Sequence, residues 1–189
     1  MKLKIGISGN RGSFSEEAAR YYCAKNSITE YDIDFLIGVE NALGALTAGT
    51  ADKAIFPIEN SNGGAVIEAL YAMANHIFSI EELFEIDIKH HLHVFPGMTT
   101  GQIKKIVSHP QALKQCRMYL KRKWEETELM EYSDTASAAE DLGKGALAQE
   151  CAVIAPKVCA NLYGLEILEE NIQDLKFNYT SFICAVKKK

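Results

Sequence analysis

One order of segments recurs in the first part of the chain: a short strand, a polar loop with glycines, and the apolar start of a helix. Leu3 to Ser8 has the composition of a strand, and Gly9 to Gly12 forms the loop. Ser13 and Glu16 have the spacing of a helix cap, and apolar residues recur at helical spacing from Phe14. The strand Lys53 to Ile58 and the loop Glu59 to Gly64 repeat this order. Strands joined by helices pair in parallel, so the sequence predicts an α/β fold with helix N-termini along one edge of a sheet.

The pattern changes in the middle of the chain. Phe78 to Phe95 is a long run of strand-forming residues without a helical apolar stripe, and we interpret it as the crossing into a second lobe. Strands are expected again over Lys104 to Ser108 and Ala152 to Ala155, with Pro110 at the start of one helix and Asp134 as the cap of another. The pattern predicts two α/β lobes in one domain of residues 1–189. Lobe 1 is about 1–78 with 170–189, and lobe 2 is about 79–169.

Composition excludes several classes of protein. The net charge of -5 supplies no basic patch for nucleic acid or a membrane surface, and no apolar run reaches the roughly 20 residues of a membrane span. No secretory signal pattern opens the chain. The cysteines are odd in number, scattered and mostly in apolar surroundings, which is typical of reduced thiols in the cytoplasm. They are Cys23, Cys116, Cys151, Cys159 and Cys184.

A polar pair interrupts the strand-forming run from Asn178 to Val186. Side chains alternate along a strand, so Asn178, Thr180 and Phe182 are expected on one face and Ser181 on the other. The run is also compatible with an ordinary final strand, and other stretches decide between the two interpretations.

Several motifs occur in the order typical of one family. They are Gly9 to Ser15, Pro57 to Val66, Val107 to Cys116, Asp134 to Ala139, Tyr163 to Leu165 with Ile172 to Asp174, and Asn178 to Phe182. Together they resemble the catalytic domain of prephenate dehydratase over essentially the whole chain. The resemblance implies two lobes with a ligand cleft between them, arranged as in periplasmic binding proteins, and a homodimer.

The resemblance implies an enzyme that converts prephenate to phenylpyruvate, water and carbon dioxide in phenylalanine biosynthesis. Aromatisation drives this reaction, so neither a metal nor a cofactor is required. Thr180 is the expected catalytic residue, which would hydrogen-bond the leaving hydroxyl. The expected substrate-binding residues are Gly12, Ser13, Asn60, Ser61, Gly64, Gln111, Gln115, Thr135, Ala136, Asn178 and Phe182. The helix N-termini that follow Gly12, Gly64 and Thr135 are expected to present backbone N–H groups to the substrate carboxylates.

Ser181 departs from the family pattern, which has Arg after the catalytic Thr. Loss of an Arg that binds a carboxylate would cost about 1.5–3 kcal/mol, unless Arg11 or Lys157 replaces it. Two alternatives therefore stay open: a related enzyme that acts on arogenate or prephenate with another outcome, and a ligand-binding module without turnover. No regulatory ACT or chorismate mutase pattern accompanies the motifs, so phenylalanine is not expected to inhibit this chain alone.

Two other patterns in the sequence do not predict a binding site. His90, His91 and His93 lack the acidic or cysteine partners that a zinc site needs. The family resemblance favours a structural or ligand-cleft role for His90. Gly6, Gly9 and Gly12 do not form the dinucleotide-binding Gly-x-Gly-x-x-Gly pattern.

Overall fold

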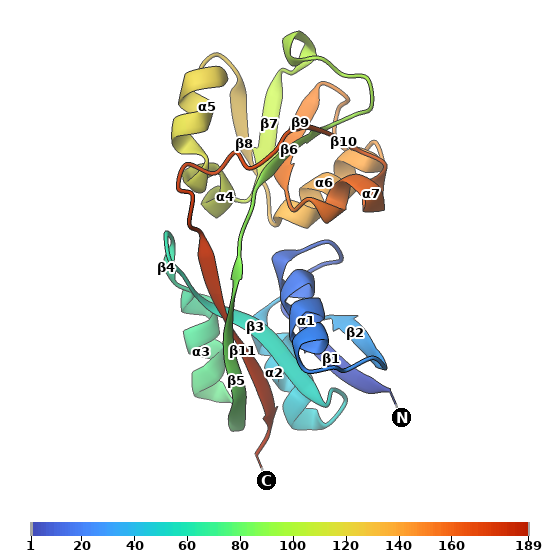
Figure 1. Cartoon of the computed structure of the whole chain (residues 1–189), viewed down its shortest axis with the longest axis vertical. Helices are drawn as coiled ribbons and strands as arrows, with labels where there is room; N and C mark the ends of the chain where they lie inside the picture. Colours follow the sequence, from blue (N-terminus) through green and yellow to red (C-terminus); the bar gives the residue numbers. More distant parts are fainter. Residues whose placement is uncertain (1, 189) are drawn as a thin grey trace. The chain divides into compact units, whose positions relative to one another are not determined.

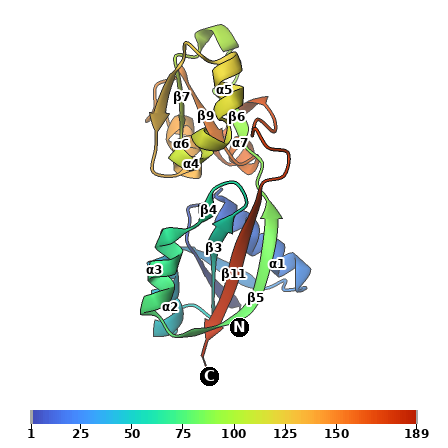
Figure 2. The ribbon, with the colours of Figure 1, turned by 90° about the vertical axis from the view of Figure 1, so that its left-hand side faces the viewer.

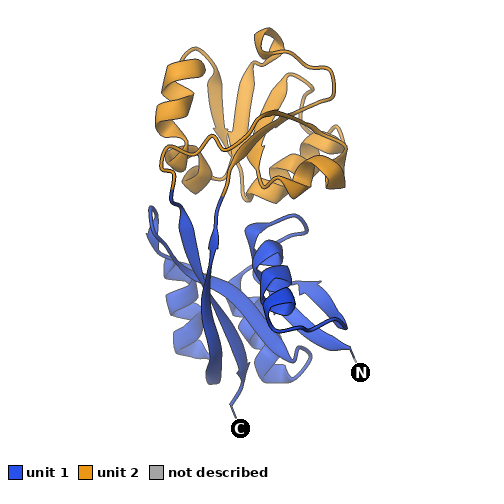
Figure 3. Cartoon of the chain, viewed as in Figure 1, with its two compact units in different colours: residues 1–88, 177–189 blue, residues 89–176 orange. Residues whose placement is uncertain are grey.

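The computed structural model describes residues 2–188 and divides the chain into two compact units (Figure 3). Unit 1 consists of residues 1–88 and 177–189, and unit 2 of residues 89–176. Each has its own sheet, with helices on both faces. The predicted α/β class is therefore confirmed. None of the helices in residues 2–188 combines the length and the apolar character that crossing a membrane requires.

The sheet of unit 1 has the order β2-β1-β3-β11-β5, with the short β4 paired to β3. The strands are β1 (Leu3–Ile7), β2 (Tyr31–Phe35), β3 (Lys53–Asn60), β4 (Gly64–Ala65), β5 (Phe78–Asp87) and β11 (Tyr179–Lys187). The first three strands are parallel, as the strand and helix order predicted. β11 enters between β3 and β5 and is antiparallel to both, so segments from both ends of the sequence form one sheet (Figure 1).

Helices cover both faces of this sheet (Figure 2). α1 (Phe14–Lys25) packs on one face, where Ile5, Phe84 and Phe182 are core residues. α2 (Val39–Ala48) and α3 (Ile67–Asn75) pack on the other face, against Phe56 and Ile183. Because Phe182 and Ile183 belong to opposite cores, β11 is buried on both faces.

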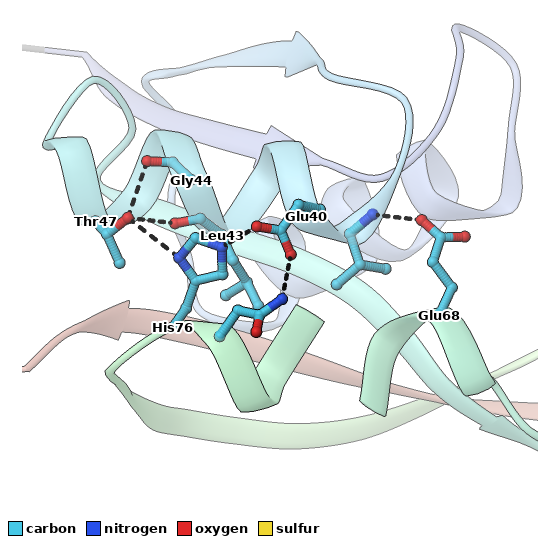
Figure 4. Close-up of polar contacts among 8 residues, drawn as sticks. Glu40, Leu43, Gly44, Thr47, Glu68 and His76 are labelled. Carbon is cyan, nitrogen blue, oxygen red and sulfur yellow. Dashed lines mark hydrogen bonds and ion pairs between the residues drawn. The ribbon is translucent and has the colours of Figure 1, made fainter. Parts of the chain in front are cut away.

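Polar contacts join α2 to α3 at both ends (Figure 4). Glu68 on α3 accepts the N–H of Val39 at 3.0 Å, which satisfies a donor at the start of α2. His76, just after α3, lies 2.7 Å from Glu40 and 3.4 Å from the hydroxyl of Thr47. The Thr47 hydroxyl donates to backbone carbonyls of its own helix, so it is not an activated nucleophile. The contacts among His76, Glu40 and Thr47 connect the two helices.

The sheet of unit 2 has the order β10-β6-β9-β7-β8. Its strands are β6 (His91–Val94), β7 (Lys105–Ser108), β8 (Glu128–Glu131), β9 (Cys151–Ala155) and β10 (Glu166–Glu169). The short 3₁₀ helix η1 (Thr100–Gln102) precedes β7. α4 (Pro110–Gln115) and α5 (Arg117–Lys123) pack on one face, and α6 (Thr135–Gly143) and α7 (Val158–Tyr163) on the other.

The boundary between the units differs from the expected one. The sequence pattern predicts residues 79–88 in the second lobe, but β5 pairs with β11 from Phe78 to Asp87 and belongs to the first sheet. The return to unit 1 comes at Phe177, later than the expected residue 170. Strand-forming composition located β5 correctly but could not identify its pairing partner.

Gly143 is predicted to be the glycine of unit 2 that tolerates a side chain least. A Cβ added there would lie 2.4 Å from the backbone oxygen of Tyr163, which would force α6 and α7 apart. We expect Gly143→Ala to lower the free energy of unfolding by about 1–3 kcal/mol in urea titrations. Gly101→Ala is the matched control, because a Cβ there meets nothing within 4 Å and the expected change is below about 0.5 kcal/mol. Equal stability of the two variants would contradict this packing.

Candidate functional site

The predicted site residues of unit 1 lie at one edge of its sheet. The loop Gly9 to Ser13 follows β1, Asn60 ends β3, and β11 begins beside it at Tyr179. The carboxyl ends of parallel strands share an edge, and antiparallel β11 brings its first residues to that edge. This topology places Asn60, Asn178 and Thr180 together.

Asn60 and Thr180 are directly opposite each other on β3 and β11. Both are largely buried. The amide nitrogen of Asn60 donates to the hydroxyl oxygen of Thr180 at 2.8 Å. The Thr180 hydroxyl therefore acts as an acceptor towards Asn60 and keeps its own proton. Within residues 2–188 that proton has no acceptor, so the hydroxyl can donate it to a bound ligand.

Asn178 and the loop after β3 hold this pair in place. The side-chain oxygen of fully buried Asn178 accepts from the amides of Asn60 at 2.9 Å and Asn62 at 3.1 Å. The side-chain oxygen of Asn60 accepts the backbone N–H groups of Asn62 at 3.0 Å and Gly63 at 2.8 Å. Ser61 adds two bonds to Tyr179, one through its backbone and one through its hydroxyl. The orientation of the Asn60 amide is therefore fixed from both sides.

The loop before α1, where an anion site is expected, already holds a carboxylate of the protein. Gly12, which has a left-handed φ of 86°, donates its N–H to the buried carboxylate of Glu16 at 2.6 Å. Ser13 caps the helix by accepting the Glu16 N–H at 3.3 Å, as predicted. Glu16 in turn pairs with Arg20 at 2.6 Å. A carboxylate of the same helix therefore already binds the Gly12 N–H, and anion binding by the helix N-terminus that follows stays a prediction.

Gly64 precedes the helix N-terminus that is expected after it, with two residues between Gly64 and the start of α3. It is an exposed residue of β4 opposite Asn60, and α3 begins only at Ile67 with Val66 as its cap. Its φ of 79° suits glycine, and its contact with substrate stays a prediction.

Phe182 was expected to contact substrate but lies in the core. It is 1% exposed and stacks on Phe84 with ring centroids 6.0 Å apart. Alternation put Phe182 on the face of Thr180 but could not show how deep that face is buried. Its side chain has no surface for a ligand and instead supports the strand that carries Thr180.

The expected residues of unit 2 lie where β7 and β8 end. Gln111 and Gln115 are half-buried on α4, which follows β7. Thr135 is the first residue of α6 after β8, and Asp134 caps this helix by accepting the N–H of Ser137 at 2.9 Å. The side chain of Ala136 is fully buried among core residues, so the substrate contact predicted for Ala136 is left to its backbone.

Histidines at the start of β6 add contacts that the sequence did not predict. Nε2 of His90 lies 2.7 Å from the side-chain oxygen of Gln115, and Nε2 of His93 lies 3.2 Å from the carbonyl oxygen of Ala155. Burial lowers the pKa of His90 and of His93 to about 4. Burial also lowers the pKa of His91. Across residues 2–188, His, Cys, Asp and Glu side chains form no group of three placed to hold a metal ion.

Comparison with known proteins identifies the family of this chain. The family model described as prephenate dehydratase matches residues 5–189. The chain belongs to the prephenate dehydratase family. Among curated relatives, it is 33% identical over 188 residues to arogenate dehydratase 5, chloroplastic, of Arabidopsis thaliana, covering 98% of this chain and 42% of the relative. It is 32% identical over 181 residues to the bifunctional chorismate mutase/prephenate dehydratase of Stutzerimonas stutzeri, covering 96% and 48%.

Solved structures agree with this family assignment. Prephenate dehydratase from Arthrobacter aurescens, solved in complex with L-Phe, superposes with a TM-score of 0.89 at 28% identity. The match covers 99% of this chain and 60% of that one. A periplasmic substrate-binding protein of an ABC transporter from Coxiella burnetii shares the fold, with a TM-score of 0.53 at 14% identity over 98% of this chain and 84% of that one. This family member thus spans less than half of the curated relatives described above.

Ser181 remains the departure from the family motif. Its hydroxyl donates to Glu85 at 3.0 Å, directly across from it on β5. Thr180 bonds Asn60 on the other neighbouring strand, β3. No Lys or Arg within residues 2–188 forms an ion pair with Glu85. In this member of the family the position after Thr180 is neutral and faces an unneutralised carboxylate.

The buried histidines predict a loss of stability on acidification. Both His90 and His93 are neutral in the fold until about pH 4, whereas in the unfolded chain they take up protons near pH 6.5. Their contribution is complete above about pH 6.5 and falls between pH 6.5 and 4, by about 2 kcal/mol for each histidine at pH 5. Urea unfolding at pH 7 and pH 5 measures this change. His93→Phe should shrink the difference between the two pH values, and an unchanged difference would contradict the assignment.

Proposed function

We propose that this chain is a prephenate dehydratase, which forms phenylpyruvate, water and carbon dioxide from prephenate in phenylalanine biosynthesis. The Thr180 hydroxyl carries this proposal, because Asn60 binds its oxygen and leaves its proton for the substrate. In the reaction the bond between the ring and the carboxylate breaks, and its electron pair enters the ring as the ring hydroxyl leaves. One proton converts the departing hydroxide to water, so the dianion and a proton give phenylpyruvate, carbon dioxide and water.

The role of Thr180 is to stabilise the leaving oxygen. An unperturbed threonine is too weak an acid to protonate it outright, so the hydroxyl acts as a hydrogen-bond donor aimed at developing charge. The Asn60 amide keeps that donor in one orientation, because it occupies the acceptor side of the Thr180 oxygen. The remaining substrate contacts that we propose are Ser13, Asn60, Ser61, Gln111, Gln115, Thr135 and Asn178.

Arogenate is the second candidate substrate. It carries an ammonium group where prephenate has a keto group, and several relatives are named arogenate dehydratases. Ser181 in place of Arg, opposite the carboxylate of Glu85, removes a positive charge from this part of unit 1. Both substrates are therefore to be assayed side by side.

Removing the Thr180 hydroxyl is predicted to abolish most of the turnover. Thr180→Ala should lower kcat about 100- to 1000-fold, because a donor aimed at the leaving oxygen is lost. Asn60→Asp tests the same proton while it keeps the Thr180 hydroxyl. A carboxylate oxygen in place of the amide nitrogen can only accept, so it binds the Thr180 proton and should also lower kcat. Ser181→Ala is the control, and its kcat should stay near that of the parent, because the hydroxyl that it removes bonds Glu85. The measurement is phenylpyruvate formation from prephenate, or phenylalanine formation from arogenate.

The outcomes separate the candidates. Full activity of Thr180→Ala would contradict the assigned role. Turnover of arogenate alone would replace prephenate as the substrate. No turnover of either by the parent, with activity restored by Ser181→Arg, would indicate a scaffold that uses another ligand.

We also propose a homodimer located in the cytoplasm. All five cysteines are free, which suits a reducing compartment. Support for a dimer comes from the outer face of α3, where Ile67, Leu70 and Tyr71 follow helical spacing and are 57%, 48% and 72% exposed.

Tyr71→Glu is predicted to convert such a dimer to monomer in sedimentation equilibrium, because it would place a charge in an apolar contact. Met118→Glu, an equally exposed position in unit 2, should leave the mass unchanged. A monomeric parent would refute the proposal, and a dimeric Tyr71→Glu would exclude this face.

A further inference from the structure

His90 and Gln115 meet through their side chains inside unit 2. His90 immediately precedes β6 and is 2% exposed, whereas Gln115 ends α4 and is half-buried. Nε2 of His90 lies 2.7 Å from the side-chain oxygen of Gln115. An amide oxygen can only accept, so Nε2 carries the hydrogen. This bond fixes which end of the Gln115 carboxamide faces the imidazole ring.

Three consecutive residues before β11 hold both partners. The side chain of Gln173 accepts the backbone N–H of His90 at 3.0 Å, and Ile172 donates to the carbonyl of His90 at 2.9 Å. Asp174 donates its backbone N–H to the carbonyl of Gln115 at 2.8 Å. Asp174 also accepts two backbone N–H groups at the start of α5. The backbones of His90 and Gln115 are therefore tied to one short segment, which fixes the distance between them.

We propose that His90 is a positioning residue, which sets the orientation of the Gln115 side chain for contact with substrate. The inference rests on the proposed function, in which Gln115 binds substrate. His90 acts through Gln115 and does not touch the substrate itself.

A nearby histidine shows what a purely structural role looks like. His93, on β6, is fully buried, but its Nε2 bonds a backbone carbonyl, that of Ala155. His90 instead directs its bond to the half-buried side chain of a proposed site residue. Burial keeps both rings neutral near pH 7, since it lowers the pKa of each to about 4. A neutral ring with hydrogen on Nε2 supplies the single donor that the Gln115 oxygen needs.

The test is a double-mutant cycle measured as kcat/KM on the substrate that the parent turns over. His90→Phe keeps a ring but removes the donor, and it should lower kcat/KM about 10- to 100-fold, as expected for a misplaced contact. In a Gln115→Ala background the same change should cost less than about twofold, because the side chain that His90 orients is already gone. His90→Gln returns an N–H donor and should recover part of the loss. His93→Phe is the matched control and should stay near the parent in kcat/KM.

Spectroscopy tests the bond without turnover. In the parent, nitrogen NMR of the imidazoles should show His90 protonated on Nε2, and this resonance should move in Gln115→Ala. An Nδ1-protonated ring would overturn the inference, as would His90→Phe and Gln115→Ala losses that multiply in the double variant. A parent without turnover overturns the proposed function and this inference with it. An active parent with an unaffected, folded His90→Phe overturns the inference alone.

Discussion

The hydrogen bonds between β3 and β11 join Asn60 to Thr180, residues 120 positions apart in the sequence. Everything proposed for Thr180 depends on this pairing. It inserts β11 between β3 and β5, buries the strand on both faces, and brings the start of β11 to the edge where β3 ends. The amides of Asn60 and Asn178 then close a network that leaves one hydroxyl proton for a ligand. The same hydrogen bonds that hold β11 in the sheet therefore orient the Thr180 hydroxyl.

Features that depend only on neighbouring residues could be predicted from the sequence. The strand and loop order, the cap at Ser13 and the cap at Asp134 depend on neighbouring residues, and the structure agrees with each. The partner of the Gly12 N–H depends on a side-chain rotamer, so Ser13 and Glu16 predicted a cap but not that Glu16 would bind the glycine. Burial depends on what covers a face. Alternation along the strand predicted a ligand contact for Phe182 but could not show that its side chain is covered.

Contacts between residues far apart in the sequence could not be predicted. β5 carries Glu81, Glu82 and Glu85 among its apolar residues, and nothing in that composition indicates which sheet it joins. The partners of Gln115 could not be found either, because they come from the start of β6 and from the segment before β11. Family motifs identified Gln115 as a candidate residue, whereas only the fold reveals which groups hold it.

The position of β11 also has a consequence for biosynthesis. A ribosome delivers residues 89–176, which contain all the strands of unit 2, before it delivers residues 177–187. Unit 2 can therefore close while β3 and β5 still lack the strand between them. Until β11 leaves the exit tunnel, two unpaired strand edges of the nascent first unit face outward, which are surfaces that chaperones bind and that promote aggregation. Thr180, the residue proposed for catalysis, is thus on the strand whose pairing covers these exposed edges.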